Sequence, residues 1–133
     1  MHDITETRTG DVQSMSRMYT TRDEKLAITD QTTDITLSAE LRALWHEYEA
    51  RQTLASQIVK DADNLDCELE CVESTARGET FGRKIQKNIR TTIRDRLFTD
   101  SAKTLYDAIQ TGDPLDWFVH GRGRHTHGDW KKA

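Results

Sequence analysis

Four residues near the start of the chain have the types and spacing to do chemistry together. His2 and Asp3 are followed by Glu6 and then by Asp11, which comes directly after Gly10. If this stretch forms the last turns of a helix, His2 and Asp3 lie four and three residues before Glu6, so all three side chains project from one side. The glycine then ends the helix and presents Asp11. An imidazole beside carboxylates is a donor set that suits a divalent cation.

A second acidic cluster occupies residues 60–66, Lys-Asp-Ala-Asp-Asn-Leu-Asp. Its Asp63 lies next to the apolar positions Val59 and Ala62 of a long amphipathic helix. A carboxylate at the edge of a core needs a partner because an unpaired buried charge is costly, and a metal ion or a histidine would provide one. Each cluster also has an ordinary interpretation: a solvated N-terminus for the first, and the polar face of a helix for the second.

Taken together, the two clusters resemble the HD-domain superfamily of metal-dependent phosphohydrolases. The string His-Asp-x-x-Glu-x-x-x-Gly-Asp runs from His2 to Asp11, and Lys-x-x-Asp follows from Lys60 to Asp63. This order is most similar to the 5′-deoxynucleotidase branch, and the similarity reaches to about Glu73. The resemblance implies an all-α fold, a compact array of several helices, and hydrolysis of deoxynucleoside monophosphates to nucleoside and phosphate.

The resemblance also implies a role for each matching residue. His2 and Asp3 correspond to the doublet that binds the divalent metal, and Asp63 corresponds to the distal aspartate ligand. Glu6 corresponds to the glutamate that acts on the attacking water or the leaving group. Asp11 corresponds to the aspartate that contacts the deoxyribose and disfavours a 2′-hydroxyl.

Phosphomonoester hydrolysis is chemically consistent with these residues. It needs a nucleophile at neutral pH, which a bound metal supplies by lowering the pKa of its water. Imidazole and carboxylate ligands suit manganese, cobalt, iron, zinc or magnesium and do not distinguish among them. A carboxylate one helical turn from the ligands, as Glu6 would be, can move a proton. We therefore expect a divalent metal cofactor and a small phosphoester or nucleotide substrate.

The chain departs from the family pattern in one respect. The family's first metal ligand is a histidine on a helix upstream of the doublet, whereas here Met1 directly precedes His2. The expectation is therefore an N-terminally truncated array that provides three of the four ligands. The alternative function is a catalytically inactive remnant that acts as an interaction or metal-binding module. An apolar groove left by the absent helix would favour a homodimer, because large exposed apolar patches tend to be covered.

Composition excludes several other classes of function. A formal net charge of −4 provides no overall positive field, which argues against nucleic acid as a partner. No apolar run is long enough to cross a membrane, and the first residues do not resemble a signal peptide. A cytoplasmic protein is expected, with Cys67 and Cys71 as buried structural thiols. Hydrophobic residues make up 35% of the chain, which is low for a globular domain and fits a thin or incomplete helical domain.

Hydrophobic periodicity places these residues on helices joined by short connections. Helical turns over 2–9 end at Gly10, and a polar loop over 11–21 follows. Further helices are predicted over 22–35, from Ser38 as its cap, over 54–76, over 83–98 and over 100–109. The helix over 54–76 has an apolar stripe of Ala55, Ile58, Val59, Ala62, Leu65, Leu69 and Val72. The organisation expected is one HD-domain-like helical domain over 1–119 and a flexible basic and His-rich tail over 120–133.

Overall fold

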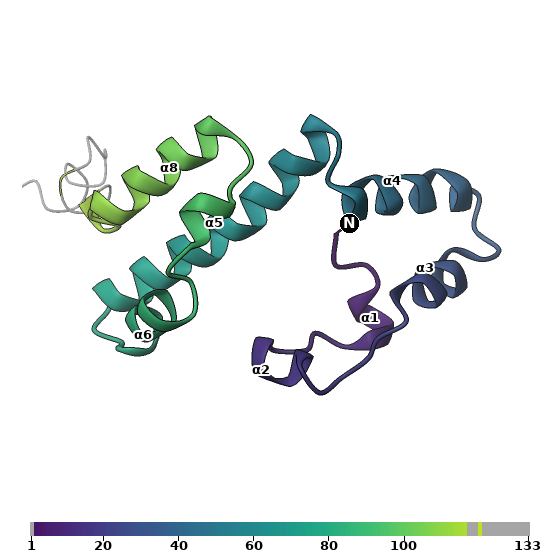
Figure 1. Ribbon diagram of the computed structural model, residues 1–133, viewed down its shortest axis with the longest axis horizontal. Coiled ribbons are helices and arrows are strands. Elements are labelled where there is room, and N and C mark those ends of the chain that lie inside the picture. Colours follow the sequence, from purple (N-terminus) through teal and green to yellow (C-terminus); the bar gives the residue numbers. More distant parts are fainter. Residues whose placement is uncertain (1, 117–119, 121–133) are drawn as a thin grey trace, which may run out of the picture. The chain divides into compact units, whose positions relative to one another are not determined.

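The computed structural model describes residues 2–116 and 120, and the helices that it contains are shown in Figure 1. Among these residues all regular structure is helical, which confirms the predicted all-α class. None of the helices in this part of the chain is both long and apolar enough to cross a membrane. The chain divides into two compact units, Met1–Gln57 and Ile58–Ala133. Each is described by itself, and the single domain expected over 1–119 stays a prediction.

The first unit contains four helices and the first turn of a fifth. α3 packs against α4, and α1 packs against α3. Asp23 begins α3 because its carboxylate accepts a hydrogen bond from the backbone N–H of Leu26 at 2.9 Å. The helices are α1 (Glu6–Thr9), α2 (Ser14–Arg17), α3 (Glu24–Thr32) and α4 (Ser38–Ala50).

A small apolar core and one arginine hold α3 and α4 together. Ile28 and Trp45 are buried, with exposed fractions of 1% and 4%. The Arg42 guanidinium reaches back from α4 and donates to Thr32 Oγ1 at 2.6 Å and to the Thr29 carbonyl at 3.0 Å. These donors satisfy carbonyl and hydroxyl groups in the last turn of α3, where the helix itself provides no partner.

The second unit is built on the long helix α5 (Leu54–Ala76), whose first turn belongs to the first unit. Figure 1 shows α8 alongside α5, with α6 near the C-terminal end of α5. Leu65 of α5 packs with Leu97 and Ala102 in the core, and Tyr106 and Ile109 cover it. The other helices are α6 (Phe81–Asn88), α7 (Ile93–Arg96) and α8 (Asp100–Thr111).

Gly82 sets how closely α6 approaches α5. A Cβ at this position would lie 2.5 Å from the backbone carbonyl oxygen of Cys71. Only glycine permits this approach, because the obstructing atom belongs to the backbone and cannot turn aside. Cys71 itself is buried, whereas Cys67 one turn earlier is exposed, so the prediction of two buried thiols is right only for Cys71.

The buried face of α5 differs from the predicted stripe. Ile58 and Val59 are 51% and 44% exposed, and of the predicted stripe only Leu65 is buried. The face that is buried carries polar side chains as well, because Phe98 and Thr99 just before α8 satisfy Asp61, and Arg90 with glutamines of α6 and α8 satisfies Glu68. The buried residues of α5 are Ser56, Asp61, Leu65, Glu68, Cys71 and Ser74.

Several local predictions are confirmed and others are wrong. The bounds of α5 agree with the predicted 54–76, and α8 begins at residue 100 as predicted, where the Thr99 side chain accepts from the Ala102 N–H at 3.2 Å. The loop predicted over 11–21 contains the short helix α2. Ser38 is the first residue of α4 and makes no capping hydrogen bond, since Leu37 occupies the cap position.

The helix predicted over 83–98 is two helices. α6 ends at Asn88 and α7 begins at Ile93. Between them Arg90 turns inward, where it pairs with Glu68 and donates to the Asn64 carbonyl at 2.9 Å. The inward pull on Arg90 and two consecutive threonines, which are weak helix formers, account for the break.

Candidate functional site

His2 and Asp3 lie in a turn that precedes α1. The His2 Nε2 atom is 2.8 Å from the Asp3 carboxylate oxygen Oδ2, and the imidazole ring lies 5.5 Å from the Tyr48 ring, centre to centre. Helix α1 begins only at Glu6, so the prediction that all three side chains project from one helix is wrong. Because His2 and Asp3 are neighbours in a turn, their imidazole and carboxylate still lie side by side, where they could serve as two donors for one cation.

Two arginines flank Glu6. The Arg17 and Arg22 guanidinium groups approach its Oε1 atom at 3.6 and 3.5 Å. Glu6 and Arg22 are mostly buried, with side chains 21% and 16% exposed, whereas Arg17 is 54% exposed. These cations keep the carboxylate of Glu6 anchored at the start of α1.

Gly10 ends α1 in the way that the sequence predicts. Its φ of 79° is a left-handed conformation, and its N–H donates to the Glu6 carbonyl at 2.8 Å. Arg22 Nη1 also donates to the Gly10 carbonyl at 3.3 Å, so the same guanidinium holds both the helix start and the turn after it. Asp11 then lies on the surface, 80% exposed and 4.0 Å from Arg17.

Asp63 lies on α5 in the second unit. Its carboxylate is 34% exposed and forms an ion pair with Lys60 Nζ at 2.5 Å. In the first unit His2 contacts Asp3, and Arg17 lies near both Glu6 and Asp11, whereas a single site that joins these residues with Asp63 stays a prediction. Among residues 2–116 and 120, no group of three His, Cys, Asp or Glu side chains gathers as a metal site.

Sequence reasoning missed the carboxylate of α5 that is most tightly bound. Asp61 is 2% exposed and accepts hydrogen bonds from the Phe98 N–H at 2.8 Å, the Thr99 N–H at 2.9 Å and the Thr99 hydroxyl at 2.8 Å. Because these donors occupy its oxygens, Asp61 ties α5 to the start of α8 and has a structural role.

Glu68 is a second buried carboxylate with the same kind of role. It is 1% exposed, pairs with Arg90, and accepts from Gln86 at 2.9 Å and Gln110 at 3.3 Å. The spacing of Asp61, Leu65 and Glu68, four and then three residues, is the helical signal that could have identified this face. The apolar residues beside it were a stronger pattern and pointed to a different face.

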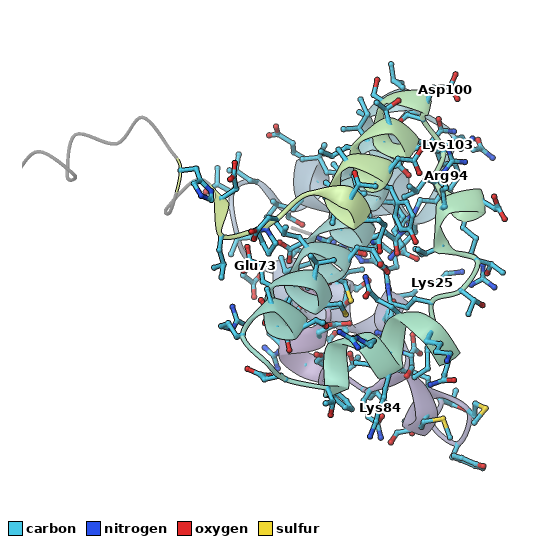
Figure 2. All side chains as sticks on the ribbon, turned by 90° about the vertical axis from the view of Figure 1, so that its left-hand side faces the viewer. Lys25, Glu73, Lys84, Arg94, Asp100 and Lys103 are labelled. Carbon is cyan, nitrogen blue, oxygen red and sulfur yellow. The ribbon has the colours of Figure 1, made fainter. Side chains whose placement is uncertain are left out.

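Four charged side chains of α7 and α8 form ion pairs, and three of them, Arg94, Asp100 and Lys103, are labelled in Figure 2. Arg94 binds Asp107 through two hydrogen bonds of 2.7 Å, and Lys103 lies 3.9 Å from Asp100. The hydrogen bond from Arg94 holds the pKa of Asp107 below its ordinary value. Exposed ion pairs of this kind contribute little free energy to the fold.

The tail predicted over 120–133 lies outside the described residues, apart from His120. This histidine is exposed, and its Nδ1 lies 2.7 Å from the Asp116 carboxylate. His46 is also exposed, and the centre of its ring lies 5.0 Å from that of Trp45.

Comparison with known proteins identifies the family of the chain. Residues 1–106 match the family model described as HD domain, and this span contains every residue of the candidate site. Neither curated protein sequences nor solved structures give a match. Proteins of this family are in general divalent-metal-dependent phosphohydrolases. Since the matched span covers most of the 133 residues, the chain belongs to the HD domain family.

Proposed function

We propose that this protein is a metal-dependent phosphomonoesterase that acts on deoxynucleoside 5′-monophosphates. The observation that carries the proposal is the family match over residues 1–106, which includes the His-Asp doublet and the Lys-x-x-Asp motif. The finer assignment to a 5′-nucleotidase rests on the string from His2 to Asp11.

The residues proposed to hold the metal are His2, Asp3 and Asp63. An imidazole and two carboxylates are a donor set that first-row divalent ions accept, and the 2.8 Å approach of His2 to Asp3 supports their joint use. A cation between these two side chains would replace their mutual contact. When bound, the metal supplies Lewis-acid activation of water and of the phosphoryl oxygens.

Glu6 is proposed to move a proton at the attacking water or at the leaving 5′-oxygen. Its carboxylate is mostly buried and is held between Arg17 and Arg22, so it would stay oriented before substrate enters. Asp11, exposed beyond the Gly10 turn, is proposed to face the sugar. Its carboxylate is accessible for a hydrogen bond to deoxyribose.

The first experiment measures release of inorganic phosphate from a panel of nucleoside monophosphates. The panel is repeated with manganese, cobalt, iron, zinc and magnesium. Wild-type protein is expected to release phosphate, and Asp63→Ala is expected to abolish release. Asp66→Ala is the matched control, since it removes an exposed carboxylate from the next turn of the same helix. A folded wild-type sample that releases no phosphate with any metal would reject the proposal.

A second experiment tests the sugar assignment. Asp11→Ala is expected to reduce the preference for deoxynucleotides over ribonucleotides, because the carboxylate would no longer disfavour a 2′-hydroxyl. The ratio of kcat/KM for the two substrate classes reports this directly. An unchanged ratio would show that Asp11 does not contact the sugar. It would not count against the proposed phosphatase activity. Metal binding by isothermal titration without phosphate release would instead favour a metal-binding module.

A further inference from the structure

Arg51 ends α4 in a backbone conformation that few residues adopt. It is the C-cap of α4 with a φ of 53°, in the left-handed region, and its N–H donates to the Tyr48 carbonyl at 3.3 Å. Glycine is the usual residue here, because a side chain costs strain in this conformation. Strained residues of this type collect at binding and catalytic sites, so the arginine side chain itself needs an explanation.

The guanidinium of Arg51 is held in place but not saturated. Its Cζ atom lies 3.2 Å from the centre of the Tyr48 ring. The backbone carbonyl of Arg51 accepts a hydrogen bond from Gln57 Nε2 at 3.1 Å. Its Nη2 has a long contact of 3.7 Å with Glu49, which exceeds hydrogen-bond distance. Its Nη1 is buried and has no hydrogen-bond partner among the residues that the structure describes.

An unpartnered buried donor is unusual in a protein. Buried polar groups are nearly always hydrogen-bonded, and each exception calls for a cause such as an absent ligand. The arginine guanidinium accepts no hydrogen bond and has a planar fork of donors that matches phosphate or carboxylate oxygens. The chain has many carboxylates, yet none of those described lies within hydrogen-bond distance of Nη1.

The Tyr48 ring connects this donor to the candidate metal ligands. One contact of the ring is the Arg51 guanidinium at 3.2 Å, and another is the His2 imidazole at 5.5 Å. All three residues belong to the first unit. The Tyr48 ring therefore contacts both the Arg51 guanidinium and the imidazole of the His2–Asp3 pair.

We infer that Arg51 binds the phosphate group of the substrate, with Nη1 donating to a phosphoryl oxygen beside His2 and Asp3. The inference rests on the proposed function for the ligand class. Tyr48 orients the guanidinium by stacking, as aromatic rings commonly do for arginine. Arg51 occupies a left-handed position at the end of α4 where glycine is usual. A glycine there would make no side-chain contact with the Tyr48 ring, whereas the arginine stacks on it.

The test is binding of inorganic phosphate to the full chain with manganese, measured by isothermal titration calorimetry. Arg51→Gly removes the guanidinium and suits the backbone conformation, so it should not harm the fold. Phosphate affinity is expected to fall by at least about tenfold, as for loss of a charged hydrogen bond. The midpoint of thermal unfolding is expected to stay within about 4 °C of that of wild type.

Two further variants serve as controls for this interpretation. Arg8→Ala removes an exposed cation of α1 in the same unit and is expected to leave the affinity nearly unchanged. Arg51→Lys keeps the charge but not the planar fork and is expected to bind phosphate less tightly than wild type. Its result decides the question if Arg51→Gly does not fold.

The outcomes separate this inference from the proposed function. Equal affinity in wild type and Arg51→Gly, an equal loss in Arg8→Ala, or no phosphate binding by wild type would overturn the role of Arg51. An unfolding midpoint that falls while the affinity holds would show that Arg51 is only structural, which also overturns it. Phosphate binding that depends on Arg51, with no nucleotide hydrolysed, would support the inference and reject the proposed function.

Discussion

Asp61 and Asp63 lie two residues apart on α5, and their substitution by alanine should change the stability of the fold to very different extents. Asp61 is 2% exposed and accepts three hydrogen bonds of 2.8, 2.9 and 2.8 Å from Phe98 and Thr99. Asp63 is 34% exposed and forms an ion pair with Lys60. We expect Asp61→Ala to destabilise the fold strongly and Asp63→Ala to leave it nearly intact.

The magnitude for Asp61 follows from the donors that its removal would strand. Each hydrogen bond to a charged group contributes about 1.5–3 kcal/mol, and each buried donor left unsatisfied costs about 1–3 kcal/mol. Water that enters the vacated space recovers part of this. The Thr99 cap of α8 is also weakened when its anchor is lost, which adds about 1 kcal/mol. We therefore expect a loss of about 3–4 kcal/mol, which is large for a single substitution.

The magnitude for Asp63 is much smaller because solvent screens the pair. A partly exposed lysine–carboxylate contact on one helix contributes about 0.5 kcal/mol. The free energy of unfolding of Asp63→Ala should therefore equal that of wild type within error. Any effect of this variant on metal binding or phosphate release can then be attributed to the carboxylate itself.

The assay is equilibrium unfolding in urea, followed by far-ultraviolet circular dichroism and by tryptophan fluorescence. Two probes are needed because the chain divides into two units, which need not unfold together. Asp61→Asn keeps the shape and one acceptor oxygen, so its loss should fall between those of the two alanine variants. If Asp61→Ala and Asp63→Ala shift the transition equally, the assignment of Asp61 as the structural acid of α5 is wrong.

Three other predictions follow from contacts of the second unit. Gly82→Ala should destabilise the fold by about 2 kcal/mol, measured by urea unfolding, because its Cβ would meet the Cys71 carbonyl at 2.5 Å. Burial raises the pKa of the Cys71 thiol to about 11, so mass spectrometry after brief iodoacetamide treatment at neutral pH should find Cys67 alkylated first. The raised pKa also means that stability present below the ordinary value of 9.0 is lost as pH rises toward 11; retention of full stability at that pH would contradict it. The pKa of Asp107 is lowered by Arg94, so its small contribution is present above the ordinary value of 3.8 and is lost as pH falls through the lowered pKa. Arg94→Ala should return that pKa to its ordinary value in an NMR titration, and an unchanged titration would show that the pair does not form.

The closeness of His2 to Asp3 and the end of α1 at Gly10 could be predicted because they depend on residues close in sequence. His2 and Asp3 are neighbours, and their contact requires only a turn. Gly10 adopts the left-handed conformation that lets α1 end, which is a property of glycine itself. The proximity of Arg22 to Glu6 joins residues far apart in the chain, and no periodicity pointed to it.

Local sequence patterns were enough to predict that the chain is helical and where α5 begins and ends. Helical periodicity and glycine stops act over a few residues, so they can be read without knowing what packs where. Which face of α5 is buried depends instead on the helices and loops that pack against it. Asp61 and Glu68 turn inward although Ile58 and Val59 are apolar, because Thr99 and Arg90 supply their partners from elsewhere in the chain. A buried carboxylate is stable only where such donors meet it, and that meeting is a property of the fold.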